Sequence, residues 1–212
     1  MTKRILCFGD SNTWGWIPGT DGERFPADVR WPGVMAADLG DGFCVIEEAQ
    51  NGRTTLWDDP TETIDKNGAR HLPVILESQK PVDLVILMLG TNDLKNHFGL
   101  NAHAIAHGCG VLADRIAASD AGPGGSAPQV LLAAPAPVAD GDCPFGHLFD
   151  SGAAVSAEFE SAYREVAELR DLPFLNAGEF ASCPIPDAIH IDAASHSRLG
   201  VAMAAKAREC LS

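Results

Sequence analysis

A chain of 212 residues, 46% hydrophobic and 21% charged, has the composition of a folded protein with a sizeable core, which excludes an intrinsically disordered chain. The formal net charge of −14 makes nucleic acid and anionic membrane surfaces unfavourable partners, because both carry negative phosphate groups. No apolar stretch approaches the length of a membrane span, and Ile5–Phe8 is too short for a secretory signal. We therefore expect a single domain over residues 1–212, located in the cytoplasm, with all six cysteines reduced, Cys143 included.

Five short apolar runs predict the strands of a buried parallel sheet. Continuous apolar runs are typical of strands covered on both faces, as in a sheet between two layers of helices. In chain order, the runs are Arg4–Phe8, Phe43–Glu47, Asp83–Leu89, Gln129–Ala134 and Pro173–Asn176.

Helices are expected between and after these strands, at Trp31–Leu39, Ala102–Ala118, Ser156–Leu172 and Ala194–Leu211. In the third of them the apolar stripe consists of Phe159, Tyr163, Val166 and Leu169. Alternation of strands with helices predicts an α/β fold with three layers, α/β/α, built on a flavodoxin-like five-stranded parallel sheet of order 2-1-3-4-5.

The loops after the first three predicted strands hold candidate functional groups. Ser11, in the segment Gly9–Thr13, stands at the carboxyl end of the first strand, where such sheets form their ligand crevice. Gly52 follows the second strand, and its backbone N–H can approach a ligand closely because it has no side chain. Asn92 follows the third strand, where its amide can donate to a developing oxyanion. Each motif alone has an ordinary alternative, respectively a capping turn, a turn glycine and an Asx turn.

Asp187 and His190 stand just before the last predicted helix, with two residues between them. A single turn can present both side chains on one side, so the aspartate can accept from one imidazole nitrogen while the other faces a nucleophile. The alternative is ordinary loop chemistry near a helix start.

The combination is more specific than its parts. In the order 2-1-3-4-5 the first three strands are neighbours about 4.8 Å apart, so Ser11, Gly52 and Asn92 are expected to converge within roughly 10 Å. They would form a three-donor oxyanion hole, and the Asp187/His190 turn would complete a nucleophile, a base and its orienting group.

These blocks resemble the SGNH (GDSL-like) hydrolase superfamily in order and spacing across nearly the whole chain. The similarity is greatest to its bacterial arylesterase and perhydrolase-type acyltransferase branch. The segments that carry it are Arg4–Ser11, Thr13–Trp16, Val29–Trp31, Arg53–Thr55 and Met88–Asp93.

The resemblance implies Ser11 as nucleophile, His190 as general base and Asp187 as its orienting group, with Ser11, Gly52 and Asn92 as oxyanion donors. It implies hydrolysis of short-chain alkyl and aryl esters, acyl transfer to alcohols or peroxide, and a homo-oligomer, often an octamer. Small-molecule esters are thus the expected partners, and no cofactor is expected.

Asn12 departs from this branch, in which the residue after the nucleophile is more often leucine, and we expect it to reshape the substrate pocket. Trp14, Trp16, Phe149 and Ile189 are candidates for an apolar lining; the alternative for them is core or subunit packing. Lys95 is placed at the pocket edge, with a solvated lysine as the equal alternative.

Other chemistries find little support in the sequence. His103 and His107 lie four residues apart but have no evident third ligand, so no metal site is expected. The same triad is also compatible with a carbohydrate O-acetyl esterase or a thioesterase. A non-catalytic binding module that retained the fold is the remaining alternative.

Overall fold

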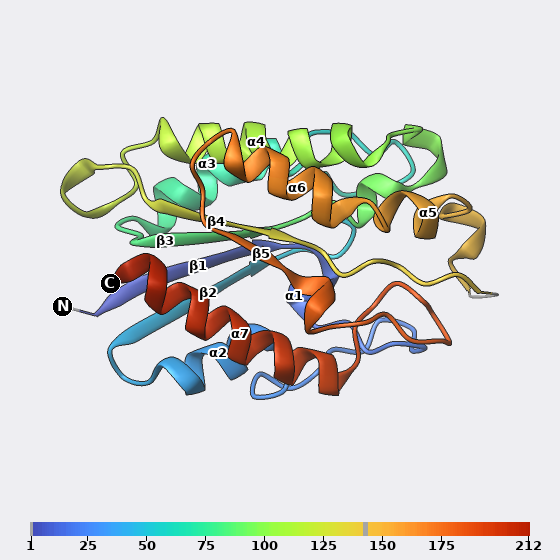
Figure 1. The fold of residues 1–212 in the computed structure, drawn as a ribbon, viewed down its shortest axis with the longest axis horizontal. Coiled ribbons are helices and arrows are strands. Elements are labelled where there is room, and N and C mark those ends of the chain that lie inside the picture. The colour runs from blue at the N-terminus through green and yellow to red at the C-terminus, as the bar shows by residue number, and fades with distance from the viewer. Residues whose placement is uncertain (1, 142–143) are drawn as a thin grey trace.

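The computed structural model describes residues 2–141 and 144–212 and contains a five-stranded parallel sheet of order β2-β1-β3-β4-β5 (Figure 1). The strands are β1 (Lys3–Gly9), β2 (Phe43–Ala49), β3 (Leu84–Met88), β4 (Gln129–Ala134) and β5 (Phe174–Asn176). This confirms the predicted fold class, and each strand lies within two residues of its expected bounds.

The position of a strand in the sheet decides how far it is buried. β3 has neighbours on both sides, and all five of its residues are buried. β2 lies at an edge, and each of its seven residues is partly exposed. Both faces of β2 are nevertheless covered, since Ile46 packs against the core on one face and Val45 against the core on the other. The partial exposure comes from the open edge of the strand, which has no neighbouring strand.

Helices cover both faces of the sheet, with α3, α4 and α6 on one face and α2 and α7 on the other (Figure 1). The helices are α1 (Ser11–Trp14), α2 (Trp31–Leu39), α3 (Gly68–Gln79), α4 (Ala102–Ala117), α5 (Gly152–Ser156), α6 (Phe159–Glu168) and α7 (Ala193–Leu211). Each layer has its own core, exemplified by Leu72 and Ile105 on the first face and by Trp31 and Leu199 on the second. No helix in the described ranges combines the length and the apolar character that crossing a bilayer requires.

Three helical regions differ from expectation, the first being the four-residue α1, which was not predicted. The predicted helix Ser156–Leu172 is broken at residues 157–158 into α5 and α6, and Leu169 lies beyond α6 with 75% of its surface exposed. α3 was not expected, and it contains Pro73, which cannot donate to the carbonyl of Ala69 four residues earlier. Arg115 donates to that carbonyl instead at 2.6 Å, so α4 satisfies the acceptor that the proline leaves free.

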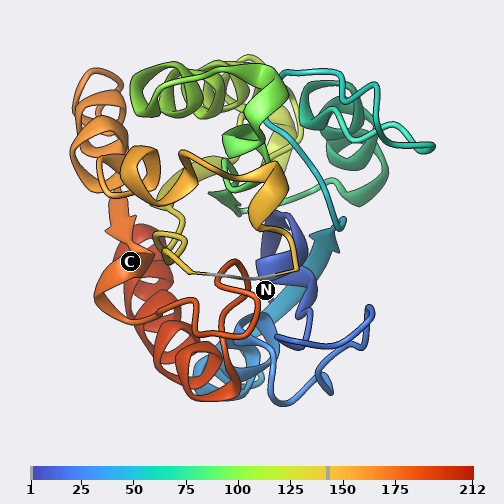
Figure 2. The same ribbon diagram turned by 90° about the vertical axis from the view of Figure 1, so that its right-hand side faces the viewer.

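The carboxyl ends of the strands, seen face-on in Figure 2, gather the loops that the sequence singled out. β1, β2 and β3 are adjacent, so the segments that follow them share one edge of the sheet. The segment before α7 reaches the same edge, as its contacts with residues 11 and 12 establish. Of the cysteines, those at positions 7, 44, 109, 183 and 210 are free, whereas Cys143 is outside the described residues.

Candidate active site

Ser11 is the first residue of α1 and follows β1 after a single residue, Asp10. The Asp10 carboxylate accepts the Asn12 N–H at 2.9 Å and caps this short helix. A Cβ at Gly9 would lie 2.1 Å from Thr13 Oγ1, so only glycine allows the chain to turn so closely from strand to helix. The turn presents the Ser11 side chain at the carboxyl edge of the sheet.

His190 lies between a carboxylate and the Ser11 hydroxyl. Its Nδ1 is 2.9 Å from Asp187 Oδ2, and its Nε2 is 2.9 Å from Ser11 Oγ. Since the carboxylate accepts the proton on Nδ1, Nε2 is left with a free lone pair for the hydroxyl proton of Ser11. The three predicted side chains thus form one continuous line of hydrogen bonds.

Asp187 is fully buried, and both of its oxygens are occupied. Oδ1 accepts the backbone N–H groups of Ile189 and His190 at 3.0 and 2.9 Å, while Oδ2 accepts from His190 Nδ1 and from the Gly19 N–H at 3.3 Å. Burial by itself would raise the pKa of Asp187, but the hydrogen bonds from His190 and Ile189 outweigh it and hold the pKa below its usual value. The carboxylate therefore stays ionised beside the imidazole.

Two aromatic rings fix the plane of the imidazole. Trp16 stacks on His190 with ring centroids 5.1 Å apart and an interplanar angle of 15°. Phe145 meets the same imidazole edge-on at 6.0 Å. Both rings limit the access of water to the base.

The three residues expected to supply the oxyanion donors, Ser11, Gly52 and Asn92, all line one pocket. Asn92 Nδ2 donates one hydrogen to the carbonyl of Arg53 at 3.1 Å, which leaves its second hydrogen for a ligand. Among the described residues, neither the Ser11 N–H nor the Gly52 N–H has an acceptor. The predicted convergence of these three loops is thus present in the structure.

The pocket encloses about 290 Å³ and has two chemically different walls. The apolar wall consists of Trp16, Phe145, Leu148, Phe149 and Ile189, and the polar wall consists of Asn51, Glu62, Lys66 and Lys95. Four of the residues expected to bind substrate are therefore in the lining: Trp16, Lys95, Phe149 and Ile189.

The other two expected pocket residues, Asn12 and Trp14, do not line this pocket. The Asn12 amide donates to the Ile189 carbonyl at 3.2 Å and accepts the Ile191 N–H at 3.0 Å. Trp14 instead lies beneath the guanidinium of Arg24, 4.8 Å from its ring centroid. Asn12 therefore joins the serine turn to the histidine loop, and its effect on the pocket is indirect.

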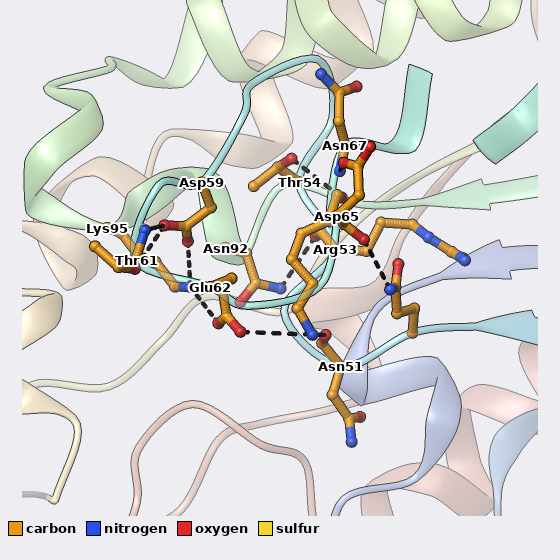
Figure 3. A network of polar contacts seen from close by, with 12 residues as sticks. Asn51, Arg53, Thr54, Asp59, Thr61, Glu62, Asp65, Asn67, Asn92 and Lys95 are labelled. Carbon is orange, nitrogen blue, oxygen red and sulfur yellow. Dashed lines mark hydrogen bonds and ion pairs between the residues drawn. The ribbon is translucent and has the colours of Figure 1, made fainter. Parts of the chain in front are cut away.

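The polar wall belongs to a partly buried network of polar contacts (Figure 3), of which the sequence predicted only Lys95 and Asn92 as site residues. Lys95 Nζ pairs with Asp59 Oδ2 at 2.6 Å and with Glu62 Oε1 at 3.2 Å, so it is not the solvated lysine of the alternative reading. Burial opposes ionisation of Asp59, but hydrogen bonds from Lys95 and Thr61 prevail and lower its pKa to about 2. Apart from Lys95, which follows β3, these residues come from a loop without periodicity, and their sequence signal is closely spaced opposite charges between β2 and α3.

Two further carboxyl groups lie beneath the site. Asp93 accepts from the N–H and the hydroxyl of Thr55, and burial raises its pKa to about 7. Burial also raises the pKa of Asp10 to about 6, against the hydrogen bond from Asn12. These two residues brace the loops: Asp10 caps α1, and Asp93 ties the segment after β3 to the one after β2.

Comparison with known proteins agrees with this geometry. Residues 7–198 match the sequence profile of the GDSL-like Lipase/Acylhydrolase family. An inhibitor-bound aryl esterase of M. smegmatis is 44% identical with a TM-score of 0.93, over 98% of this chain and 99% of that one. A carbohydrate acetylesterase from Sinorhizobium meliloti is 42% identical over the same shares, also with a TM-score of 0.93.

A putative arylesterase from Agrobacterium tumefaciens is 37% identical with a TM-score of 0.89, over 98% of this chain and 99% of that one. A search of curated protein sequences gave no match. The profile match covers most of the chain, and the structural matches extend over nearly all of it at well above 30% identity. The chain therefore belongs to the GDSL-like lipase/acylhydrolase family.

Proposed function

We propose that this chain is a serine esterase that hydrolyses short-chain alkyl and aryl carboxylic esters through an acyl-enzyme. The observation that carries the proposal is the unbroken line from Asp187 through His190 to Ser11, with 2.9 Å at both imidazole contacts. Free N–H groups beside the hydroxyl and the family membership support the same reaction.

In the proposed acylation step, Ser11 Oγ attacks the ester carbonyl carbon while its proton passes to His190 Nε2. The carbonyl oxygen becomes an oxyanion that accepts hydrogen bonds from the Ser11 N–H, the Gly52 N–H and the Asn92 amide. The C–O bond to the leaving group then breaks, and the departing alcohol takes the proton from Nε2. Asp187 stabilises the imidazolium that exists between the two proton transfers.

Deacylation repeats these steps with a second acceptor. Water attacks the acyl carbon, gives its proton to His190, and the acid leaves as Ser11 regains its hydrogen. The apolar wall around Trp16 and Phe149 disfavours water. We infer that alcohols or peroxide compete as acceptors, so the enzyme also transfers acyl groups.

Ser11→Ala tests the nucleophile. We expect kcat for p-nitrophenyl acetate to fall by about four to six orders of magnitude, because the acyl-enzyme cannot form. Labelling by a serine-directed fluorophosphonate is expected to disappear, while the circular dichroism spectrum stays the same. The matched control is Ser161→Ala on the exposed side of α6, which is expected to keep full activity. Undiminished turnover in the Ser11 variant would refute the assignment.

A second candidate activity is O-deacetylation of carbohydrates. It is favoured by the polar wall of Glu62, Lys66 and Lys95, which offers partners to hydroxyl groups, and by the likeness to a carbohydrate acetylesterase. Turnover of p-nitrophenyl acetate, acetylated xylose and acetyl-CoA separates the readings. Dominant activity on the sugar ester would replace the arylester assignment, and dominant activity on acetyl-CoA would make the chain a thioesterase.

Three further proposals concern the molecule as a whole. We propose that residues 1–212 form one SGNH-hydrolase-like domain, that the protein resides in the cytoplasm, and that it assembles into a homo-oligomer. Light scattering on the purified protein measures the subunit number, and cell fractionation tests the location. A monomeric mass or an extracytoplasmic fraction would contradict the respective proposal.

A further inference from the structure

The N–H of Gly52 belongs to the central peptide of a tight turn. The Arg53 N–H donates to the Gln50 carbonyl at 3.1 Å, which closes a β-turn over residues 50–53. Gly52 has φ +80°, the value of the third residue in a type II turn. A type I turn uses the same four residues with the central peptide turned over. With residues 50 and 53 held in place, the Asn51–Gly52 peptide can therefore adopt either of two orientations. The type I orientation would turn the Gly52 N–H away from the site.

Lys66 holds this peptide from its opposite side. Its ammonium donates to the Asn51 carbonyl at 2.8 Å. In a planar trans peptide the C=O and the following N–H point in opposite directions, so fixing the Asn51 oxygen also fixes the direction of the Gly52 N–H. The Lys66 stem covers the glycine as well, since a Cβ there would lie 3.3 Å from Lys66 Cε.

The position of Lys66 is itself fixed. Its carbonyl accepts the Thr54 N–H at 3.0 Å, and its ammonium lies 3.5 Å from Glu62 Oε2. Glu62 is in turn held by Lys95, as Figure 3 shows. The Lys66 side chain is only 11% exposed, so its contact with the Asn51 carbonyl is largely shielded from water.

We propose that Lys66 is a positioning residue, which sets and polarises the Gly52 donor of the oxyanion hole through the Asn51 carbonyl. A charge-assisted hydrogen bond to a peptide oxygen draws electron density from the amide and strengthens its N–H as a donor. The benefit is greatest when the substrate carbonyl oxygen bears a full negative charge, so it acts on the transition state rather than on the bound ester. This inference rests on the proposed esterase function.

The test compares Lys66→Met, which keeps the apolar stem but loses the charge and the donor, with Lys66→Arg, which keeps both. For p-nitrophenyl acetate we expect Lys66→Met to lower kcat about 10- to 100-fold with KM within twofold, less than the roughly 10²–10³-fold typical of losing a donor outright. Affinity for an aryl trifluoromethyl ketone, whose serine adduct carries an oxyanion, is expected to fall by the same factor as kcat/KM. Lys66→Arg is expected to recover most of the loss.

The matched control is Lys206→Met on α7, which is expected to leave kcat and KM unchanged. Lys206 pairs with Glu209, its one charged partner among the described residues. The inference would be overturned if Lys66→Met left kcat unchanged or changed KM alone. It would also be overturned if the loss of kcat differed between p-nitrophenyl and phenyl acetate, because that would indicate contact between Lys66 and the leaving group. If Lys66→Met does not fold, Lys66→Gln takes its place with the same criteria. Should the wild-type protein neither hydrolyse esters nor react with a fluorophosphonate, the proposed function fails instead.

Discussion

Asp187 illustrates how one side chain determines the tautomer of its neighbour. One carboxylate oxygen is committed to the backbone N–H groups of residues 189 and 190, and the other faces His190 Nδ1. Because the carboxylate oxygen Oδ2 can only accept a hydrogen bond, the imidazole must carry its hydrogen on Nδ1. That requirement is what leaves Nε2 available to accept from Ser11.

Asp187→Asn is expected to lower kcat by about three to four orders of magnitude. The two backbone N–H groups retain the amide oxygen, so the amide NH₂ faces Nδ1 and drives the imidazole proton to Nε2, where it blocks the base. The measurement is kcat and KM for p-nitrophenyl acetate, with KM little changed. Asp192→Asn is the matched control, because asparagine caps the start of α7 as well as aspartate does. A loss smaller than tenfold would mean that another group orients His190.

Some residues of the candidate site could be predicted from their position next to a strand or helix, and others could not. Ser11, Asn92 and the Asp187/His190 pair follow predicted strands or precede a predicted helix, so position in the fold predicted their meeting. Lys66 and Glu62 could not be found in this way, because an irregular loop has no period from which side-chain direction follows. It is the folded loop that places Glu62 and Lys66 beside Gly52.

Among the elements, α1 and the segment before α7 are joined through Asn12. Its amide donates to the Ile189 carbonyl and accepts the Ile191 N–H, and both bonds are buried. These bonds flank His190 on either side along the chain. Asn12 therefore helps to fix the distance between the serine turn and the imidazole.

Asn12→Ala is expected to lower the free energy of unfolding by about 1–3 kcal/mol, because the Ile191 N–H is left buried without a partner. We also expect kcat to fall more than KM changes, since Ser11 and His190 lose their fixed separation. Urea unfolding and steady-state kinetics measure the two effects. Asn96→Ala, at an exposed position, serves as control and is expected to stay within about 0.5 kcal/mol of wild type. Equal stability of the Asn12 variant and wild type would show that the bridge is dispensable.

Strand positions were predictable to within two residues because the five apolar runs are continuous and well separated along the chain. α3 was not, because Pro73 argues locally against a helix and the compensating donor, Arg115, comes from another helix. The break between α5 and α6 was likewise hidden: the predicted apolar stripe begins at Phe159, beyond the break, and therefore says nothing about residues 157–158. Local patterns predict elements well except where a distant residue decides the outcome.

For the whole molecule, the buried carboxyl groups couple stability to pH. Burial raises the pKa of Asp93 to about 7 and that of Asp10 to about 6, from an ordinary value of 3.8. Folded protein then binds these protons more tightly than unfolded protein does. Their contribution to stability is complete below about pH 4 and is lost as the pH rises through 6 and 7.

We expect the free energy of unfolding of wild type, relative to Asp93→Asn, to decrease as the pH rises from 5 to 7, by at most about 1.4 kcal/mol per pH unit. The comparison with the variant is needed because burial lowers the pKa of His196 to about 4, which gives the opposite slope over this range in both proteins. Urea unfolding at pH 5, 6 and 7 provides the values. The control is Asp41→Asn at an exposed position, whose free energy of unfolding is expected to change with pH in the same way as that of wild type. If the free energies of unfolding of wild type and Asp93→Asn changed with pH in the same way, this would contradict a raised pKa for Asp93.

The strand order also has a consequence for biosynthesis. Ser11 and His190 are 179 residues apart in the sequence, and β1 needs both β2 and β3 beside it in the sheet. During translation the hydroxyl therefore appears well before the imidazole, with β2, β3, β4 and β5 made in between. The nascent polypeptide consequently carries its serine in a chemically dormant form, and unfinished chains cannot attack cellular esters.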